Sequence, residues 1–362
     1  MSPTIGVDVP LLPEHKVTEK RAASVSGAVF NVSTSIIGAG IMSIPATLKV
    51  LGVIPAFVLI VVIAWLADIS VEFLMRYTYS GESKTYAGVM REAFGTVGSV
   101  AVQICVMITN LGCLIIYLII IGDVLSGNVH EGSVHLGVLQ EWFGIHWWNS
   151  RAFALFFIVV FVMLPLVSFR RVVHPIGFEL GKPSDMISAV RISLVICAVI
   201  YFSIGIFGYL LFGESIMADI LVNFDRSSDT ASGALLNDMV RLSYALHLML
   251  VFPLLNFSLR ANIDEFLFPR KTLLAKDTTR FVSLTLIILI FTYLLAIAIP
   301  NIWYFFQFVG STSAVCLAFI FPGAIVLRDT HRISTTKDRI IASTMIILAV
   351  EVPSPLLSSK EP

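Results

Sequence analysis

The residues best suited to chemistry lie in one apolar segment near the N-terminus. Its centre reads Gly38-Ala39-Gly40-Ile41 and is followed by Ser43 and Pro45. Glycine weakens a helix, and a break inside an apolar segment leaves backbone groups without helical partners. The amides of Ala39, Gly40 and Ile41, at the start of a second half-helix, could then hold a carboxylate by hydrogen bonds and the helix dipole. The alternative is that these small residues only allow close helix packing.

Three further residues are candidates for coupling to a cation or a proton. Asn31 and Thr34 precede the glycines in the same segment, where they and nearby carbonyls would bind a cation or relay a proton. His247 lies in the middle of a later apolar segment. An ionisable residue inside such a segment is a functional hypothesis, and histidine titrates in the range that a proton-coupled carrier uses. A neutral histidine bonded to a neighbouring helix is the alternative.

The other polar groups in apolar segments have structural explanations. Asp68, Glu72 and Arg76 are spaced four apart, which predicts pairing along one helix face. Asp123 is expected at a solvated helix end, with a gating role as the alternative. The hydroxyls of residues 310–313, Gly-Ser-Thr-Ser, face either a cavity or a neighbouring helix.

Motifs of enzymes and metal sites are missing from the sequence. It has no nucleophile elbow, P-loop, HExxH motif or zinc-type cluster. Its four cysteines lie inside apolar runs without the spacing of metal ligands. We therefore predict no catalytic residues, no metal site and no cofactor.

Composition indicates what kind of protein must position these residues. The chain has 362 residues, of which 57% are hydrophobic and 13% charged, and its formal net charge is zero. Soluble domains average about 25% charged and 45–50% apolar residues. The neutral balance also lacks the basic excess of a nucleic-acid binder. The chain is predicted to be an all-α polytopic membrane protein embedded in a lipid bilayer.

Apolar runs of roughly 20 residues, the length that crosses a bilayer, divide the chain into spans and tails. A polar tail covers residues 1–24, a transmembrane domain covers 25–350, and a second polar tail covers 351–362. A ninth apolar run, Ile340–Val350, is too short to span. The eight expected spans are 25–48, 52–75, 98–125, 151–168, 188–212, 238–258, 281–299 and 302–327.

The distribution of basic residues predicts the orientation of these spans. Nineteen Lys and Arg residues fall in the N-terminal tail and in every second loop after it. The alternate loops hold only Lys49, Arg151, Arg226 and Arg241. Because cytosolic loops carry an excess of Lys and Arg, the N-terminus is predicted to be cytosolic.

Three stretches resemble the amino acid/auxin permease family, and within it the plant vacuolar transporters and the related sodium-coupled neutral amino acid transporters. They are residues 37–45 (IGAGIMSIP), 121–127 (IGDVLSG) and 174–181 (HPIGFELG). The resemblance implies an inverted-repeat fold of five plus five helices with a broken first helix. It also implies that the substrate carboxylate binds at Gly38, Ala39, Gly40 and Ile41.

The same resemblance bears on the coupling ion. The cation position of the sodium-coupled relatives falls near Asn31 and Thr34. Their eighth-helix hydroxyl positions fall on Met249 and Val251, which are poor ligands because sodium prefers oxygen. Protons are therefore expected as the driving ion, in preference to sodium.

The chain departs from the family pattern at two places. Family members carry a fifth span and most of a sixth before the His174 motif, whereas only Arg171-Val-Val joins residue 170 to His174 here. The tail from Glu351 replaces the end of the eleventh span. We therefore expect an incomplete version of the fold, with about eight full spans, one partial span and a junction near 169–174.

Two functions follow as expectations. The first is a secondary active, proton-coupled amino acid transporter in the vacuolar or another endomembrane, a location that the acidic dileucine pattern of residues 8–12 also favours. The second is a truncated, non-transporting splice form or gene model that associates with a full-length relative. The preferred amino acid is left open.

Overall fold

The computed structural model describes most of the predicted transmembrane domain. The described residues are 25–83, 85–130, 133–168, 183–217, 219–224, 231–268, 274 and 277–351. The N-terminal tail, the junction at 169–174, the motif at 174–181 and all of the C-terminal tail after Glu351 lie outside them.

Helices make up almost all of the described chain, which confirms the all-α fold. The first half contains α1 (Val25–Ile36), the 3-10 helix η1 (Ala39–Ser43), α2 (Ile44–Leu51), α3 (Val53–Ser80), α4 (Tyr86–Ser126), α5 (Val138–Phe143), η2 (Trp147–Asn149), α6 (Arg151–Ile158), the π-helical turn η3 (Val159–Met163) and α7 (Leu164–Ser168). A short hairpin, β1 (Asn128–His130) and β2 (Ser133–His135), follows α4.

The second half continues in the same way. It contains α9 (Pro183–Phe212), η4 (Gly213–Ser215), α10 (Ile220–Asn223), α11 (Ala231–Leu267), α12 (Thr278–Ala298), α13 (Ile302–Val309), the π-helical turns η6 (Gly310–Ala314) and η7 (Cys316–Ile320), α14 (Phe321–Arg328) and α15 (Thr336–Glu351).

The eight predicted spans all correspond to helices in the described residues. Seven segments are long and apolar enough to cross a membrane, and the eighth is the pair α1 and η1–α2, bent by 55° at its break. The predicted break in the first span is thereby confirmed. α15 has 16 residues and is not among these segments.

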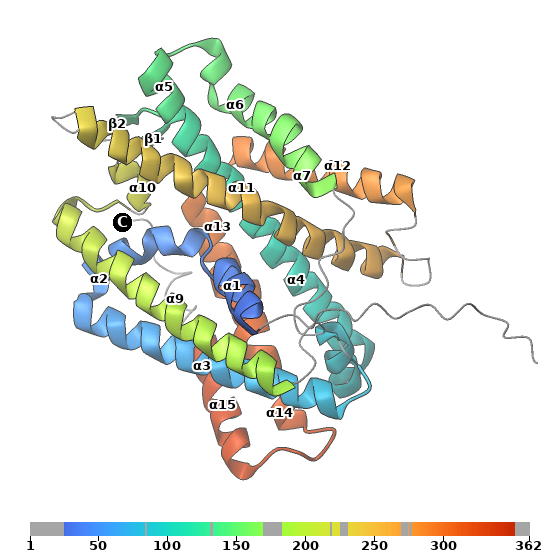
Figure 1. The fold of residues 1–362 in the computed structure, drawn as a ribbon. Coiled ribbons are helices and arrows are strands. Elements are labelled where there is room, and N and C mark those ends of the chain that lie inside the picture. The colour runs from blue at the N-terminus through green and yellow to red at the C-terminus, as the bar shows by residue number, and fades with distance from the viewer. Residues whose placement is uncertain are drawn as a thin grey trace, which may run out of the picture.

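Helix α4 forms the centre of the larger core. Its residues 114–121 are buried and pack with apolar residues of α11, α12 and α6. On the other side, α9 packs along α1, α2 and α3, so that α1 and α2 lie between α9 and the α4–α11 pair (Figure 1). The broken segment therefore has helices on more than one side, which can supply partners for its freed backbone groups.

Candidate functional site

The break in the first span is centred on Ile37 and Gly38. α1 ends at Ile36, and η1 begins at Ala39 after Gly38, whose φ of −108° and ψ of −162° are extended rather than helical. Ile41 N donates to Gly38 O at 3.3 Å as the first bond of the 3-10 turn. Two residues are thus taken out of the helix, and the chain changes direction there.

Side chains from two other helices occupy the carbonyls that the break frees. Tyr201 Oη of α9 donates to Ile36 O at 2.6 Å. Tyr244 Oη of α11 donates to Gly38 O at 2.9 Å, and His247 Nε2 lies 2.9 Å from Ile37 O. In the membrane an unpaired backbone group costs several kcal/mol, so these partners stabilise a backbone that the apolar surroundings would otherwise disfavour.

The amides that follow the break lie at the start of a helix. Ala39 N and Gly40 N are the first amides of η1, so the helix itself offers them no acceptor. Ala39 and Ile41 are buried, Gly38 is half-buried and Gly40 is exposed. The four predicted carboxylate-site residues therefore form one turn whose exposed point is Gly40.

A row of residues on α9 attaches α1 to the rest of the bundle. Ser193, Cys197 and Tyr201 follow one face at intervals of four, and they contact the carbonyl oxygens of Val29, Ser33 and Ile36 at 3.1, 3.7 and 2.6 Å. Sequence reasoning missed this row. Its signal was the i, i+4, i+8 spacing, which places three side chains on one helix face.

Asn31 and Thr34 have positions that do not converge on the break. Thr34 Oγ1 donates to Phe30 O at 2.7 Å, within α1. Asn31 is exposed on the helix surface, and its own carbonyl accepts from Ser35 Oγ. Of the three predicted coupling residues, only His247 contacts the break.

The position of His247 is compatible with both interpretations drawn from the sequence, a coupling role and a bond to a neighbouring helix. It is bonded to a neighbouring helix, as the structural interpretation requires, and its partner is a carbonyl of the break. Because a carbonyl only accepts, Nε2 carries the hydrogen and Nδ1 is the nitrogen that would take up a second proton. The Tyr244 ring stacks at 6.0 Å beside it.

The charged residues at the helix ends pair more widely than expected. Glu72 and Arg76 pair along α3 at 2.8 Å as predicted, while Asp68 and Glu72 also bind Arg191 of α9. Arg76 in addition binds Asp338 of α15. These contacts join α3, α9 and α15 at one end of the bundle.

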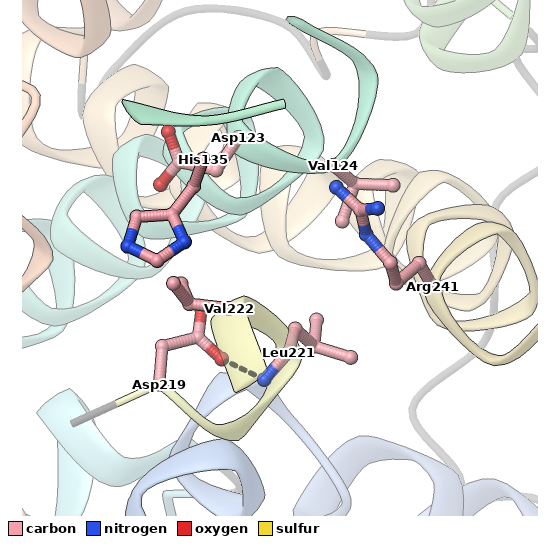
Figure 2. Close-up of a pocket in the computed structure, with 7 residues that line it drawn as sticks. All are labelled: Asp123, Val124, His135, Asp219, Leu221, Val222 and Arg241. Carbon is pink, nitrogen blue, oxygen red and sulfur yellow. Dashed lines mark hydrogen bonds between the residues drawn. The ribbon is translucent and has the colours of Figure 1, made fainter. Parts of the chain in front are cut away.

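The expectation that Asp123 is a solvated helix end is wrong. Its carboxylate forms an ion pair with Arg151 at the start of α6, and its side chain is only 12% exposed. Asp123 also lines a small cavity under the hairpin (Figure 2). The error arose because the partner lies 28 residues away and belongs to another helix.

Taken together, the eight membrane-crossing segments and the broken first span define an all-α polytopic membrane protein. The family described as "Transmembrane amino acid transporter protein" matches residues 21–171 and 168–357. The chain belongs to this family, and the resemblance stated from the sequence is confirmed.

Curated relatives give the same result. The chain is 52% identical to amino acid transporter AVT6C of Arabidopsis thaliana and 50% identical to amino acid transporter AVT6D of the same plant, in both cases over 97% of this chain and 96% of the relative. A putative sodium-coupled neutral amino acid transporter 10 of Xenopus laevis is 26% identical over 94% of this chain and 38% of its own length. The expectation of a transporter rather than an enzyme agrees with these names.

Proposed function

We propose that this chain is a secondary active amino acid transporter that binds the substrate carboxylate at the turn Gly38–Ile41. The observation that carries the proposal is the broken first span, in which donors from α9 and α11 satisfy the carbonyls while Ala39 N and Gly40 N begin a helix. Amides at a helix start attract anionic groups. The names of the plant relatives supply the substrate class, amino acids.

We further propose that protons drive transport. Met249 and Val251, which stand where sodium-coupled relatives have hydroxyls, pack against the core and present no hard oxygen ligand. His247 is the imidazole in contact with the break. Protonation of His247 would add positive charge next to a bound carboxylate and so link the two binding events.

The proposed membrane is the vacuolar or another endomembrane, with the N-terminus in the cytosol. The excess of basic residues in alternate loops supports the orientation. The dileucine pattern at residues 8–12 and the resemblance to plant vacuolar transporters support the location.

A second candidate is a non-transporting form that associates with a full-length relative. The two parts of the family match meet at residues 168–171, and the alignment with AVT6C spans 418 positions although this chain has 362 residues. In addition, Asn31 and Ser35 of α1 are exposed on a membrane helix, where polar side chains favour protein neighbours. Both observations favour a bundle that lacks helices its relatives possess.

Uptake by proteoliposomes tests the first proposal against the second. We would measure uptake of labelled amino acids with and without an imposed pH gradient, for the wild type, Gly40→Ala and Gly310→Ala. A Cβ built at either glycine meets nothing within 4 Å, so both variants should fold. We expect uptake by the wild type to depend on the pH gradient. Gly40→Ala should reduce the uptake rate about tenfold, since a methyl group crowds the exposed amide turn. Gly310→Ala should keep the uptake rate within about twofold of the wild-type rate.

The outcomes separate the candidates. Uptake that ignores the pH gradient but requires sodium would contradict proton coupling. Equal uptake by Gly40→Ala and Gly310→Ala would contradict the carboxylate site. No uptake by folded wild-type protein across the common amino acids would favour the non-transporting form.

A further inference from the structure

A buried carboxylate lies apart from the break, at the end of the bundle where α5, β1, β2 and α10 gather, here called the hairpin face (Figure 1). Asp219 precedes α10 and is only 8% exposed. It lines a small cavity together with Asp123, His135 and Arg241, and Figure 2 shows its side chain and His135 on opposite sides of that space.

Asp219 has no cationic partner in the part of the chain that the structure describes. Its Oδ1 accepts a hydrogen bond from Leu221 N at 2.9 Å and so caps α10. The cations nearby are paired elsewhere, because Arg151 binds Asp123, and Arg241 binds Glu141 at 2.7 Å. An ionised carboxylate in this position is costly, since burial without a pairing cation disfavours the charged form.

The neighbours of α10 connect this carboxylate to the broken span. Helix α10 packs against η1 and α4, and its Ile220 and Leu221 share a core with Ile41 and Met42 of η1. Asn223 closes the segment into a compact turn by accepting from Met217 N and donating to Ser215 O. Movement of α10 away from η1 would therefore uncover the turn that begins at Ala39.

Titratable groups of three neighbouring elements lie around Asp219. They are Asp123 of α4, His135 of β2, and Arg241 and Tyr244 of α11. η1 contributes none, because residues 39–43 are Ala, Gly, Ile, Met and Ser. Tyr244 is close enough to interact electrostatically with Asp219 and also donates to Gly38 O, so the two sites share a neighbour.

We propose that Asp219 is a proton-binding site of the hairpin face, and that its protonation holds α10 closed over η1 while its ionisation releases α10. The link of this switch to transport rests on the proposed function. The switch itself is a property of the folded chain and can be measured without substrate.

The direction of the response follows from burial. Desolvation raises the pKa of Asp219 from 3.8 to about 6 with α10 closed, and exposure on opening would return this pKa toward its ordinary value. A group whose pKa is higher in the closed state favours closure as the pH falls. With these two pKa values, lowering the pH from 7 to 5 increases the ratio of closed to open protein about tenfold. The predicted orientation places the hairpin face on the non-cytosolic side, where protons would then promote closure.

Hydrogen–deuterium exchange of the full chain in lipid nanodiscs tests the switch without amino acid present. After correction for the intrinsic pH dependence of exchange, we expect about tenfold slower opening of residues 219–223 and 39–43 at pH 5 than at pH 7. Asp219→Asn keeps a capping side chain but cannot ionise, so both pH values should give the slow exchange of the wild type at pH 5. Asp219→Ser, which also retains a cap, provides a second variant should Asp219→Asn not fold.

Glu214→Gln is the matched control, because this exposed carboxylate lies in the same connection between α9 and α11. It should retain the wild-type pH dependence. If the exchange of Asp219→Asn still depends on pH, another group such as His135 causes the response, and the proposal is overturned. Equal exchange at both pH values in the wild type would also overturn it. If the wild type takes up no amino acid but its hydrogen–deuterium exchange still depends on pH, the transport proposal is contradicted and the switch is supported.

Discussion

Two apolar spans of this protein contain a glycine followed by small or polar residues, but their backbones have different conformations at that glycine. At Gly38 the first span leaves the helix and bends by 55°. At Gly310 the chain keeps helical φ and ψ through the π-helical turn η6. Similar composition thus gives a break in one span and a wider helical turn in the other.

The difference lies in which groups reach the backbone. Ser311 Oγ and Thr312 Oγ1 donate to carbonyls one turn earlier in their own helix, at Gln307 and Phe308. At Gly38, by contrast, the donors are Tyr201 and Tyr244, which come from α9 and α11. The carbonyls at the Gly38 break thus have donors from other helices, whereas the hydroxyls next to Gly310 bond within their own helix.

Leucine substitutions at the two glycines should give the largest contrast. A Cβ at Gly38 lies 3.0 Å from Tyr117 Oη, whereas a Cβ at Gly310 meets nothing within 4 Å. Overpacking costs about 1–3 kcal/mol, so we expect Gly38→Leu to weaken amino acid binding up to about 100-fold. Gly310→Leu should bind amino acids with an affinity within about twofold of that of the wild type. Equilibrium binding to purified protein is the measurement, and equal losses in both variants would remove the distinction.

Removal of the tyrosine hydroxyls should have an intermediate effect on stability. Tyr201→Phe and Tyr244→Phe each remove one of two donors from a carbonyl of the break, whose other donor is Gly38 N or Ile41 N, at a cost of about 1 kcal/mol. Thermal unfolding in lipid nanodiscs measures the loss. Tyr293→Phe is a suitable control, since its hydroxyl contacts the exposed first turn of α6 and its removal should cost about 0.5 kcal/mol. A destabilisation no larger than that of the control would show that the break does not depend on these donors.

Thr312→Val should have the smallest effect. Its hydroxyl bonds back to Phe308 O in the same helix, an arrangement that contributes little to helix stability. We expect a change below about 0.5 kcal/mol in the same unfolding measurement. A loss matching that of Tyr244→Phe would mean that η6 also depends on its side-chain donors.

The sequence was sufficient to predict the eight spans and the break. Each span is a run of apolar residues long enough to cross a bilayer, so composition alone locates it. The glycines at 38 and 40 mark a local weakness, and the structure bends between Ile36 and Ala39. Both features depend on residues that are adjacent in the chain.

The partners of the break could not be predicted in the same way. Tyr201, Tyr244 and His247 reach it from 165, 206 and 210 residues away. The local pattern places Tyr201 on one helix face with Ser193 and Cys197, but it does not indicate which carbonyls Tyr201 or Tyr244 would reach. The pairs of Asp123 with Arg151 and of Asp68 with Arg191 were missed for the same reason.

Binding of amino acids and of their carboxamides to purified protein tests the central claim, a carboxylate site at Gly38–Ile41, most directly. The carboxamide keeps the side chain and the amino group but has no negative charge for the amides of η1 to hold. We predict that carboxamides bind at least about tenfold more weakly than the amino acids, and that Gly38→Leu removes this preference. Equal affinity for both forms in the wild type would contradict the claim.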